Sequence, residues 1–275
     1  MNTAPLHPTP LHTASRFHHL LAAEWTKFWS VRSVSLVLGL TTLGVLAANL
    51  RSAQYMADNS RVGDAFNPQA AFDTAFTLLG SDLLLLVTAG VGAMVSVSEY
   101  ATGLVRTTFV AVPRRRAVLT AKAVVLAAVM TGYGLLLAGL SFWLTQALLA
   151  GKHLGLSVAA PGAPRFLAAT ALYAPVCALV GFCLGVLLRH GAATVVAGVL
   201  VLFVLPSLFT DTHAWTAAVG HAMPLNAWRF LTRIDLGDQL PLHHPPTVPG
   251  AWAAYAGWAL AATGLSVLVA DRRDA

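Results

Sequence analysis

Long uncharged blocks of apolar residues dominate the pattern along the chain. Six of these blocks approach or exceed the roughly 20 residues that a helix needs to cross a hydrocarbon layer. A segment in lipid must satisfy its backbone hydrogen bonds internally, and the short alternating strands of a membrane barrel are not seen, so the blocks predict helices. We expect six transmembrane helices near residues 34–50, 83–97, 123–150, 166–188, 192–209 and 251–270.

The composition supports the same fold class. Of the 275 residues, 57% are hydrophobic and 10% are charged, whereas soluble domains carry about 25% charged residues. A water-soluble fold could not cover that much apolar surface. The loops are too short for a second soluble domain. The sequence therefore predicts an all-α, polytopic integral membrane protein with a single transmembrane domain over residues 15–275, after a disordered tail over residues 1–14 that does not read as a cleavable signal.

Lys and Arg are divided unequally between the two sides of the predicted helices. Six spans place both termini on one side, and that side then carries eleven of the 17 basic residues. Positive charge concentrates in cytoplasmic loops, so we predict a multi-pass protein of the cell (plasma) membrane with both termini in the cytoplasm. A loop at about 98–119 then faces the cytoplasm, and a loop at about 210–250 faces outward. Topology accounts for the net charge of +6, so no nucleic-acid partner is expected.

A further helix is predicted before the first span, beginning near Ser15. Two tryptophans and a lysine next to a span are typical of an interfacial helix, and we name Glu24, Trp25 and Lys27 as its functional candidates. Glu24 interrupts the apolar arc. It either pairs with Lys27, meets water at a bend, or contacts a partner protein. The arc itself consists of Phe17, Leu20, Leu21, Trp25, Phe28 and Trp29.

Motifs that would indicate catalysis are missing from the sequence. It has no G-x-x-x-x-G-K-[ST] phosphate cradle, no H-E-x-x-H and no G-x-S-x-G. We therefore expect no enzymatic activity, no cofactor and no metal in this chain. Asp82 is the one carboxylate close to a predicted span interior, and we expect it at the outer interface. Residues 227–231 are expected to form a short helix on the outer surface.

Small residues in the predicted spans are interpreted as packing residues. Cys177 and Cys183 lie six positions apart in one block and so on different faces of a helix, which predicts neither a disulfide nor a metal site. Gly132, Gly134 and Gly139 in the third block favour close approach of neighbouring helices.

Several short segments, in their order along the chain, resemble a known family. The segments are Glu24-Trp-Thr-Lys27 before the first span, Glu99-Tyr-x-x-Gly103-x-x-Arg106, Pro113-Arg-Arg and then Lys122 between the second and third, and Pro224-Leu-Asn-Ala-Trp228 before the last. With them the whole chain is similar to the permeases of type-two ABC (ATP-binding cassette) exporters, in particular small bacterial members without a fused ATPase. Leu104 departs from the family pattern, which more often has Thr or Ser after this glycine.

The resemblance implies a function and partners. The chain would be the membrane-spanning permease subunit of an exporter, as a homodimer or as a heterodimer with a similar permease. A separate nucleotide-binding subunit would bind ATP and Mg and hydrolyse the ATP. The loop at about 98–119 would be the coupling element that docks on that ATPase. Carried onto this sequence, the partner-binding residues are Glu99, Gly103, Arg106, Arg114, Arg115 and Arg116.

Two alternatives remain open at this stage. The run of three arginines at 114–116 also suits binding to anionic headgroups of membrane lipid. The whole chain could instead be a non-transporting membrane scaffold or immunity protein that binds a partner through the same basic loop.

Overall fold

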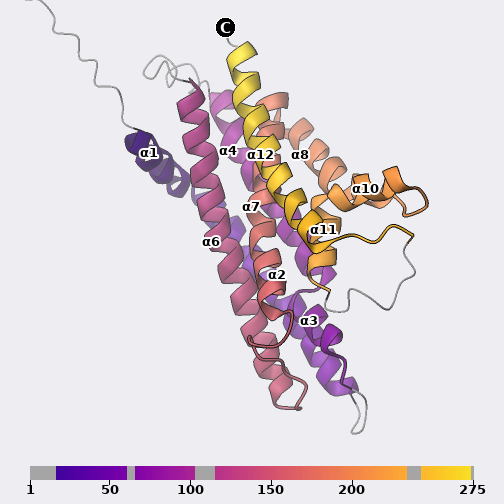
Figure 1. The fold of residues 1–275 in the computed structure, drawn as a ribbon. Helices are drawn as coiled ribbons and strands as arrows, with labels where there is room; N and C mark the ends of the chain where they lie inside the picture. Colours follow the sequence, from indigo (N-terminus) through magenta and orange to yellow (C-terminus); the bar gives the residue numbers. More distant parts are fainter. Residues whose placement is uncertain (1–16, 61–65, 103–114, 234–242, 274–275) are drawn as a thin grey trace, which may run out of the picture.

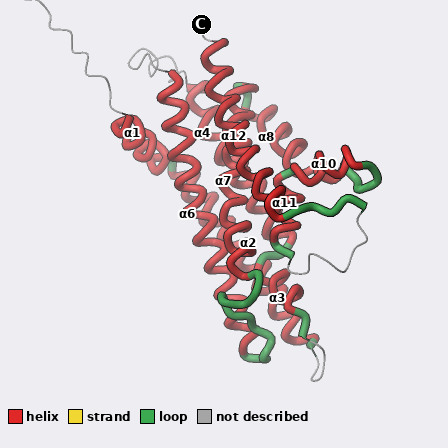
Figure 2. The backbone as a smooth tube through the Cα atoms, viewed as in Figure 1, coloured by secondary structure: helices red, strands yellow, loops and turns green. Residues whose placement is uncertain are grey.

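The computed structural model describes residues 17–60, 66–102, 115–233 and 243–273. These residues form helices and loops and contain no strand (Figure 2). The all-α prediction is therefore confirmed for the described part of the chain. The tail predicted over residues 1–14 lies outside it.

Within the described residues, six helical stretches are long and apolar enough to cross a membrane, which confirms the predicted number of spans. Four of them are single helices, and the other two are interrupted: α3 and α4 form one stretch, and α8, η1 and α9 form another. The elements are α1 (Phe17–Ser30), α2 (Arg32–Asn59), α3 (Pro68–Ala75), α4 (Leu78–Thr102), α6 (Arg115–Ala150), α7 (Ala163–Leu188), α8 (Gly191–Val199), η1 (Leu200–Val204), α9 (Leu205–Leu208), α10 (Ala214–Ala222), α11 (Pro224–Leu231) and α12 (Val248–Arg273).

Helix α7 lies at the centre of the bundle, packed against α4, α6 and α12 (Figure 1). Of its most apolar stretch, 78% is buried inside the protein, compared with 17% for α12. The peripheral helices expose large apolar side chains, for example Leu36, Leu40 and Leu43 on α2. Surfaces of this kind are stable only against lipid. The chain is therefore a multi-pass membrane protein.

Glycines allow the neighbours of α7 to approach its backbone. A Cβ atom on Gly92 of α4 would lie 1.9 Å from the carbonyl oxygen of Ala178 in α7. A Cβ atom on Gly134 of α6 would lie 2.1 Å from the carbonyl oxygen of Ala171. Gly132 and Gly139, on the same helix as Gly134, have nothing within 4 Å of such an atom. Of the three glycines that favoured close packing in α6, only Gly134 makes a close approach.

The break between α3 and α4 is held by a polar residue of α2. Asn49, which is fully buried, accepts a hydrogen bond from the backbone N–H of Thr77 at 3.0 Å. Its amide nitrogen donates to the Ser141 hydroxyl of α6 at 2.7 Å. A helix end buried in a membrane protein leaves backbone groups that need such partners. Asn49 thus joins α2, α6 and the interrupted second span.

The two long predicted loops are shorter than expected. Helix α4 continues to Thr102 and α6 begins at Arg115, so the described helices extend into the loop predicted at about 98–119. The outer loop predicted at about 210–250 contains α10, α11 and the start of α12. These segments are polar enough to interrupt the hydropathy pattern, yet they still form helices.

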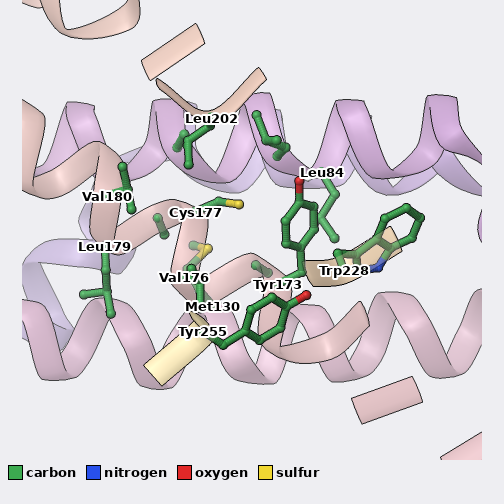
Figure 3. Close-up of a cluster of buried hydrophobic side chains, with 14 of the residues drawn as sticks. Leu84, Met130, Tyr173, Val176, Cys177, Leu179, Val180, Leu202, Trp228 and Tyr255 are labelled. Atoms are coloured by element: carbon green, nitrogen blue, oxygen red, sulfur yellow. The ribbon is translucent and has the colours of Figure 1, made fainter. Parts of the chain in front are cut away.

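The short helix predicted over residues 227–231 is confirmed as part of α11, and one face of this helix is buried against the bundle. Trp228 is 2% exposed, stacks on Tyr173 of α7 with ring centroids 5.7 Å apart, and donates from Nε1 to the Thr170 hydroxyl at 3.2 Å (Figure 3). Tyr255 of α12 also stacks on Tyr173, with ring centroids 6.3 Å apart. The indole has both an aromatic surface and a hydrogen-bond acceptor inside the protein, which favours burial over an interfacial position.

Candidate functional site

Helix α1 packs against the first part of α6 and against α2. It is separated from α2 only by Val31, whose extended backbone (φ −86°, ψ 93°) interrupts the helix. Glu24 and Phe28 are buried against the bundle, whereas Trp25 and Trp29 are 50% and 46% exposed. The predicted apolar arc is thus divided between a face that contacts protein and a face that exposes tryptophan, as expected for an interfacial helix.

A buried ion pair attaches α1 to α6. Glu24 Oε2 lies 3.0 Å from Lys122 Nζ, and both side chains are almost fully buried, with 7% and 5% exposed. Glu24 Oε1 lies 2.8 Å from Nζ of Lys27, whose side chain is 47% exposed. Loss of one member of a buried pair leaves an uncompensated charge, so the pair fixes how the two helices meet.

The sequence predicted part of this cluster. The pairing of Glu24 with Lys27, one of the alternatives for this residue, is confirmed. Lys122 was not among the predicted site residues. Its signal in the sequence is a cation directly before the apolar block of residues 123–150, since a charge that is buried at the start of a span needs a counter-charge. Nothing local in the sequence identifies Glu24, 98 positions earlier, as that counter-charge.

The remaining predicted site residues lie at the end of α4, at the start of α6 and in the segment between the two helices. Glu99 lies near the end of α4 and Arg115 opens α6, with only their backbone described. Arg116 is exposed in the first turn of α6. Gly103, Arg106 and Arg114 lie outside the described residues. The predicted contact between this segment and a partner therefore stays a prediction, while α6 itself leads directly from it to Lys122.

A small cavity of about 90 Å³ lies beside the ion pair, where four helices meet. Its lining combines charged and apolar side chains. The lining residues are Glu24, Lys27 and Phe28 of α1, Val31 between α1 and α2, Val34 of α2, Met94, Val95 and Ser98 of α4, and Lys122, Val125 and Leu126 of α6.

A second polar cluster lies where α4, α7 and α11 meet. Asp82 Oδ1, the Tyr173 hydroxyl and Arg229 Nε are buried without a hydrogen-bond partner. The charges of Asp82 and Arg229 act on each other, although no ion pair joins them in the part of the chain that the structure describes. Asp82 thus has one oxygen inside the protein, and the position at the outer membrane interface expected for this residue stays a prediction.

The arrangement defines a class: a six-span α-helical membrane protein with an interfacial helix tied into the bundle by a buried ion pair. No family model matches the chain, and a comparison with curated proteins gives no match either. Among the described residues, no group of three or more His, Cys, Asp or Glu side chains is placed to hold a metal ion.

Proposed function

We propose that the chain is the membrane-spanning permease subunit of an ATP-binding cassette exporter whose ATPase is a separate polypeptide. The observation that carries this proposal is the buried Glu24–Lys122 pair. It links the interfacial helix α1 to the first turns of α6, which directly follow the segment that the resemblance assigns to ATPase contact. Two such chains, identical or similar, would pair with two ATPase subunits that bind ATP and Mg.

The geometry of α6 supports a role in transmitting movement. Its 36 residues correspond to about 54 Å at about 1.5 Å per residue, well beyond a hydrocarbon core of about 30 Å. It contacts α7 through Gly134 and α2 through the hydrogen-bonded Tyr133 and Thr42 hydroxyls at 3.3 Å. A displacement of its first turn by an ATPase would therefore reach α7 and α2, and α1 would move with it through Glu24.

The test is purification of the tagged chain from its native membranes in mild detergent, followed by identification of bound subunits and an assay of ATP hydrolysis. We expect a stoichiometric subunit with a phosphate-binding loop and ATPase activity. Glu99→Ala and Arg106→Ala should release that subunit at least tenfold faster. Arg51→Ala, with its exposed side chain in α2 on the predicted outer side, should leave it bound.

A folded chain that purifies without an ATPase and without hydrolysis would contradict the proposal. It would favour the scaffold or immunity function instead. An ATPase that remains bound equally well in the Glu99→Ala, Arg106→Ala and Arg51→Ala variants would keep the exporter assignment but remove the role given to the segment between α4 and α6.

A further inference from the structure

The cavity beside the Glu24–Lys122 pair has a polar end and an apolar end. On α4, Ser98 lies about one turn closer to the start of the connecting segment than Met94 and Val95. On α6, Lys122 lies about one turn closer to that segment than Val125 and Leu126. Both helices therefore order the lining in the same direction, polar toward the end of the bundle and apolar toward its interior.

The apolar end lies at membrane depth and reaches the protein surface. Val34, Val95 and Val125 belong to three of the six stretches that are apolar enough to span a membrane. Val31 and Met94, which also line the cavity, are 38% and 39% exposed, so the lining of the cavity reaches the protein surface at these two residues. A volume of about 90 Å³ admits a short stretch of hydrocarbon chain but no folded peptide segment.

The polar end offers a cation at the level of lipid headgroups. The Lys27 ammonium group lies 2.8 Å from Glu24 Oε1, and its side chain is 47% exposed, so its positive charge is accessible at the surface at this end of the cavity. Trp25 and Trp29, exposed on the same helix, are the residues that usually lie at the headgroup level of a bilayer. A phosphate oxygen near Lys27 would add a charge-assisted hydrogen bond.

We propose that this cavity is a binding site for an anionic phospholipid from the leaflet on the α1 side. Its phosphate lies at Lys27, and part of an acyl chain enters between Val31 and Met94 toward Phe28 and Leu126. The order of polar and apolar lining matches the order of headgroup and chain in that leaflet. The inference concerns lipid binding by this chain alone and holds whether or not the chain is an exporter subunit.

The test uses native mass spectrometry of the purified full-length chain, released from detergent with dioleoyl phosphatidylglycerol or dioleoyl phosphatidylcholine. The two lipids have the same chains and differ in headgroup charge. We expect one retained phosphatidylglycerol, bound about fivefold more tightly than phosphatidylcholine, as one lysine near the membrane surface provides. Lys27→Gln should abolish this preference. Lys152→Gln, in the exposed turn after α6, should keep it.

A second pair of variants tests the cavity itself. Met94→Trp places a larger side chain at the opening and should weaken retention of phosphatidylglycerol at least fivefold. Leu43→Trp, at a residue of α2 that is 66% exposed and not part of the cavity, should have no effect. Equal retention of the two lipids by the unaltered chain, unchanged retention in Met94→Trp, or displacement of the phospholipid by an equal concentration of free oleate would each overturn the proposal.

Discussion

Tyr173 and Tyr255 are buried in one aromatic cluster but differ in hydrogen bonding. The Tyr255 hydroxyl donates to the Ala169 carbonyl oxygen at 3.2 Å, whereas the Tyr173 hydroxyl is buried without a partner. Tyr255→Phe should therefore cost about 0.6–1 kcal/mol of stability. Tyr173→Phe removes a desolvated hydroxyl and should be neutral or slightly stabilising. Thermal unfolding in detergent measures both, and an equal loss in the two variants would contradict this assignment.

The carboxylate of Glu24 serves two lysines, so its loss should cost more than the loss of either one. Glu24→Gln should destabilise the attachment of α1 by about 3 kcal/mol or more, because the buried Lys122 loses its ion pair with Glu24. Lys122→Met should cost less, since Glu24 keeps Lys27 at 2.8 Å. The measurement is the rate of tryptic cleavage after Lys27, together with the unfolding temperature.

A double variant provides the control for this prediction. Glu24→Gln combined with Lys122→Met replaces the buried pair by neutral groups, which is often nearly neutral for stability. It should recover most of what Glu24→Gln alone loses. If the double variant were as sensitive to trypsin as the sum of its single changes, the two residues would act independently and the ion pair would not hold α1.

At the scale of the helices, the sequence predicted the spans because lipid allows few alternatives to a continuous helix. It did not predict where a span is interrupted. The second block seemed to begin after Asp82, whereas its helical stretch begins at Pro68 and breaks before Leu78. That break depends on Asn49 from another helix. Burial of α11 likewise depends on Tyr173 and Thr170, which lie more than 50 positions away.

The sequence also does not show which glycines lie against a neighbouring helix, and two glycines of α4 provide a matched test of this point. Gly90 and Gly92 lie two residues apart on α4, but a Cβ atom would meet nothing within 4 Å at Gly90 and the Ala178 carbonyl oxygen at 1.9 Å at Gly92. Gly92→Ala must push α4 and α7 apart and should cost at least 2 kcal/mol, as overpacking of a tight contact does. Gly90→Ala should be neutral or stabilise the helix by about 0.5–1 kcal/mol.

The comparison of unfolding temperatures for the two variants decides this point. Similar effects at both positions would mean that α4 and α7 are not in backbone contact at Gly92. Sequence alone ranks the two glycines equally, because their local contexts are both apolar and helical. They differ only in where a Cβ atom would point, which is toward the backbone of α7 at Gly92 and into open space at Gly90.

At the scale of the whole molecule, the two ends of the bundle differ in the segments and in the basic residues that lie there. Helix α1, the first turn of α6 and the last turns of α12 lie at one end, and α3 and the turn after α6 lie at the other (Figure 1). Lys27 and Lys122, which the sequence assigns to the cytoplasmic side, lie on α1 and near the start of α6. Arg51 and Lys152, which the sequence assigns to the outer side, lie in the second half of α2 and in the turn after α6. The helices and their order could therefore be predicted from the sequence. The Glu24–Lys122 contact that attaches α1 to the bundle could be found only in the folded structure.

The orientation of this bundle in the membrane gives the last prediction. Both native cysteines, Cys177 and Cys183, are buried, so an introduced cysteine can be labelled against a low background. Ser157, in the loop after α6, and His18, in α1, are both exposed, and these two segments lie toward opposite ends of the bundle (Figure 1). With the excess of Lys and Arg in the cytoplasm, Ser157→Cys should react with a membrane-impermeant maleimide in intact cells, and His18→Cys only after permeabilisation. The reverse pattern would invert the topology and place Glu24, Lys122 and the segment between α4 and α6 where no cytoplasmic ATPase can reach them, so this single labelling experiment tests the orientation on which the exporter proposal depends.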